Sequence, residues 1–85
     1  MRYTLEFTAS AAREFRALDR QTQRRISTKV SELAEDPFPV GVRKFQGEED
    51  HWRIRVGDYR VIYRVEKRRV VIVIVRIGHR REVYR

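Results

Sequence analysis

The chain has 85 residues, no cysteine and a formal net charge of +8. A chain of this length forms one small domain that buries about 60% of the surface exposed by its unfolded form, which excludes a large internal ligand cavity. The absence of cysteine excludes a disulfide framework and thiolate chemistry, and two histidines alone do not supply the usual ligands of structural zinc. We therefore expect a single domain over residues 1–85, with no metal and no cofactor.

The positive charge is concentrated in the second half of the chain. Residues 1–42 carry seven basic and six acidic side chains, whereas residues 43–85 carry thirteen basic and six acidic ones. Arginine supplies 17 of the 20 basic residues, and its planar guanidinium suits bidentate binding of phosphate. This bias indicates a nucleic acid or an acidic protein as partner.

Neither a membrane span nor a signal peptide is expected. The longest apolar run, residues 70–75, is much shorter than the roughly 20 residues that a membrane helix requires. The first residues lack the apolar segment of a signal peptide. Together with the lack of cysteine, this favours a cytoplasmic protein.

The first half of the chain predicts one strand and two helices. Residues 2–7 alternate apolar and polar side chains, as a half-buried strand does. Thr8 or Ser10 then caps a helix that ends near Asp19, and Asp19 caps a second helix that stops at Asp36-Pro37. The apolar stripes of the two helices consist of Ala11, Phe15 and Leu18 in the first and of Ile26, Val30, Leu33 and Ala34 in the second. We expect an αα-hairpin that rests on a sheet.

Residues 51–65 predict a β-hairpin. Apolar residues and arginines alternate on both sides of Gly57-Asp58, and glycine at the first central position is what a type II′ turn requires. With this turn, Arg55 faces Arg60 and Arg53 faces Ile62, so the three arginines project from one face of the hairpin. The opposite face is predicted to be core, and it carries Trp52, Tyr59, Val61 and Tyr63.

Two interpretations of the three arginines remain open on composition alone. Like charges set opposite one another destabilise a sheet, so an anion that compensates them would explain their placement. The simpler interpretation is a solvated face on a very basic protein. The more specific interpretation is a phosphate-binding surface.

The end of the chain predicts a buried strand followed by a basic tail. Residues 70–75 are apolar at every position, which is typical of a strand that is covered on both faces. The turn before it contains two or four residues. The tail that follows gathers the polar residues His79, Arg80, Arg81 and Tyr84.

These elements resemble those of the RelE-type toxins of bacterial and archaeal toxin–antitoxin systems. The resemblance covers essentially the whole chain, and its most specific motifs are residues 53–63, with their Gly-Asp-Tyr-Arg turn, and residues 78–80 and 82–84. It implies an α+β fold: an N-terminal strand, an αα-hairpin and an antiparallel three-strand meander, in one small, mostly antiparallel sheet with helices packed on one face.

The resemblance also implies a function and its partners. RelE-like members cut ribosome-bound messenger RNA without a metal, which inhibits translation, whereas ParE-like members of the same superfamily inhibit DNA gyrase without nuclease activity. The expected partners are a cognate antitoxin, in a hetero-oligomer, and the ribosome with its message. A basic RNA-binding module without catalysis is the third alternative. The positions that match the ribonuclease site are Arg53, Arg55, Arg60, Arg80 and Tyr84.

The chemistry of RNA cleavage divides these residues by role. Arg60 and Arg80 would stabilise the charge on the phosphate, Tyr84 would stack on a base, and Arg53 and Arg55 would bind phosphate. The last two stand where the best-known members of the family have lysines, and arginine is a poor proton acceptor. His79 is the candidate general base, because its ordinary pKa is near 6.5; a structural histidine at a strand end is the competing interpretation.

Overall fold

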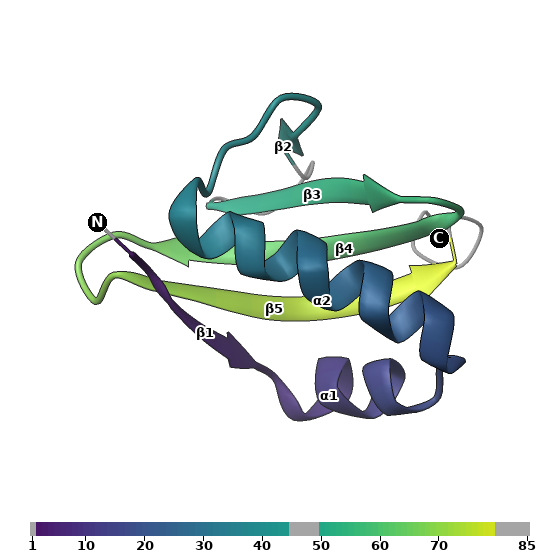
Figure 1. The fold of residues 1–85 in the computed structure, drawn as a ribbon. Coiled ribbons are helices and arrows are strands. Elements are labelled where there is room, and N and C mark those ends of the chain that lie inside the picture. Colours follow the sequence, from purple (N-terminus) through teal and green to yellow (C-terminus); the bar gives the residue numbers. More distant parts are fainter. Residues whose placement is uncertain (1, 45–49, 80–85) are drawn as a thin grey trace.

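The fold is a five-stranded sheet with two helices packed against it. The computed structural model describes residues 2–44 and 50–79. In chain order its elements are β1 (Thr4–Phe7), α1 (Ala9–Arg16), α2 (Arg20–Glu35), β2 (Arg43–Lys44), β3 (His51–Val56), β4 (Tyr59–Glu66) and β5 (Val71–His79) (Figure 1). The strand order is β1-β5-β4-β3-β2, and only the β1–β5 pair is parallel. This confirms the expected α+β class.

The two helices begin where their caps predict. The Thr8 hydroxyl accepts a hydrogen bond from the backbone N–H of Ala11 at 3.1 Å, and the Asp19 carboxylate accepts one from that of Thr22 at 3.2 Å. The Thr22 hydroxyl donates a further bond to Asp19, and these contacts hold the pKa of Asp19 below its usual value. Neither described helix is long and apolar enough to cross a membrane.

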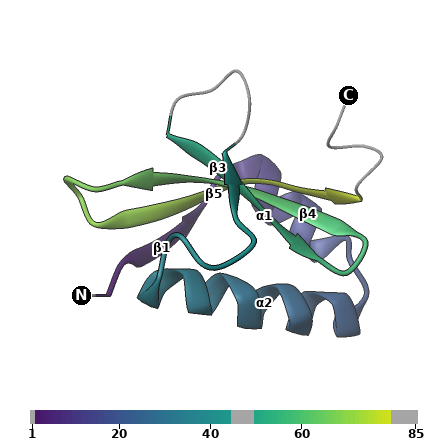
Figure 2. The same ribbon diagram turned by 90° about the horizontal axis from the view of Figure 1, so that it is seen from above.

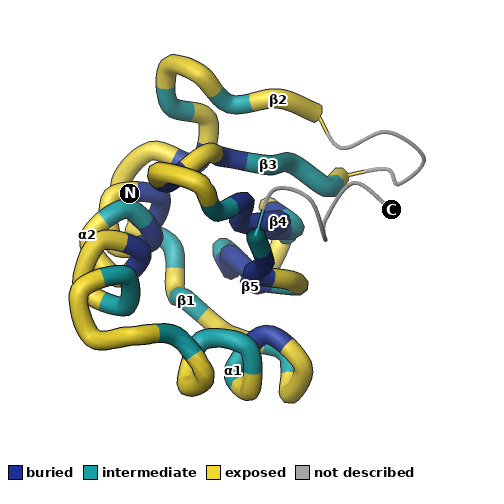
Figure 3. The backbone as a smooth tube through the Cα atoms, turned by 90° about the vertical axis from the view of Figure 1, so that its right-hand side faces the viewer, coloured by how far each residue is buried: buried dark blue, intermediate teal, exposed yellow. Residues whose placement is uncertain are grey.

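The core lies between α2 and one face of the sheet. Seen from above, α2 runs along one side of the strands (Figure 2). Its predicted stripe is buried, and the sheet presents a matching set of buried side chains: Ile54, Val56, Val61, Tyr63, Val65, Ile72, Ile74 and Ile77. In the tube view the helices lie beside this face and beside the β1–β5 edge, and no described helix covers the other face (Figure 3). The other face is therefore the one on which a site can be exposed.

Strand β5 is paired on both sides, as its uninterrupted apolar run predicts. Val71 to Ile74 are buried between β1 and β4. The preceding turn contains four residues, 67–70, and Val70 closes it with φ 56° and a backbone hydrogen bond to Lys67. Of the two turn lengths that the sequence allowed, the structure has the longer one.

A β-bulge changes which side chains of β5 share a face. Tyr63 pairs with Ile74, but Ile62 pairs with Arg76, so Val75 is an extra residue. The bulge keeps Ile77 on the core face with Ile72 and Ile74. Regular alternation that starts at Ile74 would assign each later residue of β5 to one face of the sheet. Because of the bulge, each of their side chains lies on the opposite face.

Tyr63 links the sheet to the loop after α2. It is fully buried, as predicted, and its hydroxyl donates a hydrogen bond to the Pro37 carbonyl at 2.6 Å. We expect Tyr63→Phe to lower the free energy of unfolding by about 1 to 3 kcal/mol, because it leaves a buried carbonyl without its donor. Tyr59→Phe is the matched control, since the Tyr59 hydroxyl makes no hydrogen bond with the described residues. Equal urea midpoints for the two variants would contradict this expectation.

Candidate phosphate-binding site

The β3–β4 hairpin has the predicted turn and register. Gly57 adopts φ 60° and Asp58 does not have a positive φ, which is the pattern of a type II′ turn. Arg55 pairs with Arg60 and Arg53 with Ile62, so all three arginines lie on the face away from α2.

A short strand adds a fourth arginine that the sequence analysis missed. Strand β2 pairs Arg43 with Arg53 and Lys44 with Trp52, so Arg43 joins the arginine face and Lys44 does not. The expected meander therefore gains a strand at its outer edge. A two-residue strand of charged side chains has no apolar period, so only its basic pair beside a glycine-containing loop hinted at it.

The arginines surround a small cavity near the hairpin turn. Its volume is about 200 Å³, and its lining consists of Gly41, Arg43, Arg53, Ile54, Arg55 and Arg60. We call this the arginine cavity. Four of the six described lining residues are arginines, and none of these six is acidic. Such a lining attracts an anion, and guanidinium groups bind phosphate oxygens bidentately.

The four arginines differ in depth. Arg60 is buried, with 9% of its surface exposed, whereas Arg43 and Arg55 are exposed and Arg53 is intermediate. Arg60 faces Gly78 of β5. A charge shielded from water interacts more strongly with a bound anion than an exposed one does. We therefore expect Arg60 to interact most strongly with an anion bound in the cavity.

The structure does not bring His79 to the arginines. His79 pairs with Tyr59 on the core-facing side of the sheet, and the two rings meet edge to face with centroids 5.7 Å apart. The bulge at Val75 is the physical reason, because unbroken alternation from Ile74 would have put His79 on the arginine face. This geometry matches the structural interpretation of His79 better than the catalytic one.

Two predicted site residues, Arg80 and Tyr84, lie outside the described residues. His79 is the last described residue, and Gly78 before it is the partner of Arg60. The structure therefore places Arg53, Arg55 and Arg60 together and adds Arg43 to them. The roles of Arg80 and Tyr84 stay predictions.

Glu14 fixes the end of β5 from the side. Strand β1 stops at Phe7, opposite Ile74, so β1 offers no acceptor to the later residues of β5. The Glu14 carboxylate of α1 takes that place, because Oε1 accepts a hydrogen bond from the Ile77 N–H at 2.8 Å and Oε2 lies 3.7 Å from the Arg76 guanidinium. Nothing in the sequence distinguishes this mid-helix acid from a solvated one. It supports the strand that places Gly78 beside Arg60.

We expect Glu14→Ala to destabilise the fold by about 1 to 2 kcal/mol and to speed hydrogen exchange of the Ile77 amide, because that N–H loses its acceptor. Glu14→Gln keeps an amide oxygen at the same reach and should retain most of the protection. NMR-detected exchange of the Ile77 amide is the measurement. Identical protection in wild type and both variants would show that Glu14 does not hold the strand.

The chain matches a known family over nearly its whole length. A family model described as the ParE toxin of the type II toxin–antitoxin system parDE matches residues 5–84. The chain is also 30% identical to Toxin RelG of Mycobacterium tuberculosis, over 100% of this chain and 99% of that protein. To the mRNA interferase toxin RelE of Escherichia coli it is 31% identical, over 99% of this chain and 92% of the relative.

Solved structures show the same likeness. A variant of the E. coli RelE toxin in the free state superposes with a TM-score of 0.83 at 30% identity, covering 99% of this chain and 92% of that one. A chain of the intact E. coli RelBE toxin–antitoxin complex gives 0.82 at 28% identity, covering 91% and 95%. Fold and sequence thus define a small toxin of the type II toxin–antitoxin class. The chain belongs to the ParE toxin family and is a RelE-type member of the RelE/ParE superfamily, which confirms the resemblance found in its sequence.

Proposed function

We propose that this toxin is a ribosome-dependent, metal-independent endoribonuclease that cuts messenger RNA and is neutralised by a cognate antitoxin. The arginine cavity carries the proposal, because the four arginines of its described lining suit an RNA phosphate. The mRNA interferase named among its relatives supports the reaction, and the toxin–antitoxin complex among its structural neighbours supports the partner. Acting on ribosomes, the toxin would work in the cytoplasm.

The proposed reaction uses the RNA 2′-hydroxyl as nucleophile. Its oxygen attacks the adjacent phosphorus, the bond to the 5′-oxygen breaks, and the products are a cyclic 2′,3′-phosphate and a 5′-hydroxyl after proton transfer from the 2′-oxygen to the leaving group. The transition state concentrates negative charge on the phosphate oxygens. In this proposal Arg60, the most buried arginine of the cavity, would stabilise that charge, while Arg43, Arg53 and Arg55 would hold neighbouring phosphates.

The described lining of the arginine cavity contains no proton acceptor of suitable pKa. Its ionisable side chains are all arginines, which stay protonated, and His79 points to the other face. Catalysis in this proposal therefore rests on orientation and charge stabilisation, with in-line geometry completed by the ribosome and by Arg80 and Tyr84.

A message-cleavage assay tests the proposal. Purified toxin is added to ribosomes stalled on a defined message, and the RNA ends are mapped. We expect a cut within the A-site codon that leaves a cyclic phosphate and a 5′-hydroxyl. An intact message together with inhibited gyrase supercoiling would instead support the ParE-like alternative. RNA binding without cleavage or gyrase inhibition would support the plain binding module.

A further inference from the structure

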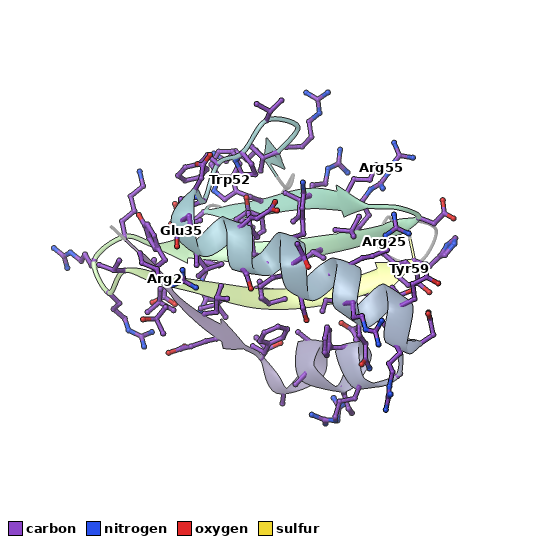
Figure 4. All side chains as sticks on the ribbon, in the orientation of Figure 1. Arg2, Arg25, Glu35, Trp52, Arg55 and Tyr59 are labelled. Carbon is purple, nitrogen blue, oxygen red and sulfur yellow. The ribbon has the colours of Figure 1, made fainter. Side chains whose placement is uncertain are left out.

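A second cavity lies at the opposite end of β3 from the arginine cavity. Trp52, which lines it, and Arg55, which lines the arginine cavity, mark the two ends of the strand (Figure 4). The second cavity has a volume of about 530 Å³. Its lining consists of Phe38, Asp50, Trp52, Arg64, Val65, Glu66, Lys67, Arg68 and Arg69. We call it the aromatic cavity.

The apolar part of this cavity is formed by two aromatic rings. Phe38 and Trp52 meet edge to face, with centroids 4.9 Å apart. Phe38 comes from the loop after α2 and is 39% exposed, although it is large and apolar. The Lys67 ammonium lies 5.7 Å from the centroid of the Phe38 ring, so a cation borders the apolar surface directly.

The rim holds four basic side chains, of which two are already ion-paired. Glu66 accepts hydrogen bonds from Arg64 at 2.9 Å and from Arg69 at 3.1 Å. The bonds from Arg64 and then Arg69 hold the pKa of Glu66 below its usual value, so this carboxylate stays charged at neutral pH. Lys67 and Arg68 make no ion pair with any residue in the described part of the chain. They are the rim cations available to a partner.

The linings of the two cavities suit different ligands. The arginine cavity has four arginines and no acid in the part of its lining that the structure describes, which suits a polyanion. The aromatic cavity has a mixed lining, with the carboxylates Asp50 and Glu66 among its basic side chains, and it has an apolar surface that a phosphate backbone does not fill. Its combination of aromatic rings and two available cations suits an apolar side chain flanked by carboxylates.

We propose that the aromatic cavity is a docking site for an acidic, apolar-anchored segment of the cognate antitoxin. An apolar anchor packs on Phe38 and Trp52, and flanking carboxylates pair with Lys67 and Arg68. The net charge of +8 favours an acidic partner overall, and the cavity gives that partner a specific point of attachment away from the arginine cavity. The proposal rests on the toxin–antitoxin class of the chain and is independent of whether the toxin cuts RNA.

Trp52 offers a direct test because it is the only tryptophan in the chain. Toxin labelled with 5-fluorotryptophan gives a single fluorine resonance, which is followed by NMR while the full-length antitoxin encoded with the chain is added. We expect the resonance to shift and to saturate at the toxin–antitoxin stoichiometry. A single-stranded RNA 12-mer at the same ionic strength should leave it unchanged. The proposal is overturned if the resonance does not shift when the antitoxin is added, or if it shifts when the RNA is added.

Reversing the charge of the two available rim cations provides a second test. A K67E/R68E variant should lose at least tenfold in antitoxin affinity by calorimetry. The control R20E/R24E makes the same change in net charge at exposed positions of α2 and should lose less than twofold. Equal losses would mean attraction by net charge alone and would overturn the proposal. Free K67E/R68E toxin should cut message as wild type does, so a wild type that binds antitoxin but cuts nothing refutes the proposed nuclease and not the docking site.

Discussion

Replacing Arg60 with alanine is expected to reduce the rate of message cleavage by about 10² to 10³-fold, the loss typical for one preorganised donor aimed at transition-state charge. Arg60 is the arginine of the cavity with the least exposed surface, at 9%, so little water competes for the phosphate oxygens that it would contact. Single-turnover cleavage on stalled ribosomes measures this rate without a contribution from product release.

Two further variants separate chemistry from folding. Arg60→Lys keeps the charge but loses the planar fork, so its rate should lie between those of wild type and alanine. Arg24→Ala removes an exposed arginine of α2, far along the chain from the hairpin, and should cut at the wild-type rate. Because Arg60 is buried, the melting temperature of each variant is measured as well. A folded Arg60→Ala toxin with wild-type cleavage would remove Arg60 from the mechanism.

The hairpin was predictable because its two-residue turn fixes which residues of the two strands pair with each other. Glycine at the first central position selects a type II′ turn, and a two-residue turn leaves a single register for the flanking strands. Every predicted pair from Val56 with Tyr59 to Trp52 with Tyr63 is present. The grouping of Arg53, Arg55 and Arg60 followed from that register alone.

The position of His79 was not predictable, because the deciding feature leaves no trace in the sequence. Residues 71–74 are buried on both faces, so apolar side chains carry no information about which way each one points. The bulge at Val75 falls at the end of this run and inverts the faces of the residues that follow. A candidate chosen by its pKa and its place in the chain therefore turned out to pack on Tyr59.

Arg43 was missed for a different reason. Its position depends on the pairing of a two-residue strand with β3, after a loop in which Gly41 adopts φ 92°. Pairing of such a short, charged segment is a tertiary event that intrinsic strand propensity does not signal. The sequence thus predicted that Arg53, Arg55 and Arg60 lie together, whereas only the structure showed that Arg43 joins them.

Arg43 and Lys44 make a matched pair for testing the arginine cavity as an RNA-binding surface. They are adjacent, exposed and alike in charge, but their side chains project from opposite faces of β2. If four arginines each contact a phosphate, the logarithm of the affinity for single-stranded RNA should fall with the logarithm of salt concentration with a slope of about −2.8. Between about 50 and 200 mM salt this slope corresponds to a loss of roughly 50-fold.

Arg43→Ala should flatten the slope by about 0.7, whereas Lys44→Ala should leave it unchanged. Fluorescence anisotropy with a 2′-O-methyl RNA measures this, because the methyl group blocks the attacking oxygen and binding is observed without cleavage. Equal slopes for the two variants would show that net charge, and not the arginine face, attracts RNA. If only Arg43→Ala reduces the slope, the phosphate contact lies on one face of the two-residue strand. A change in net charge alone cannot give this result, because both variants lose one positive charge.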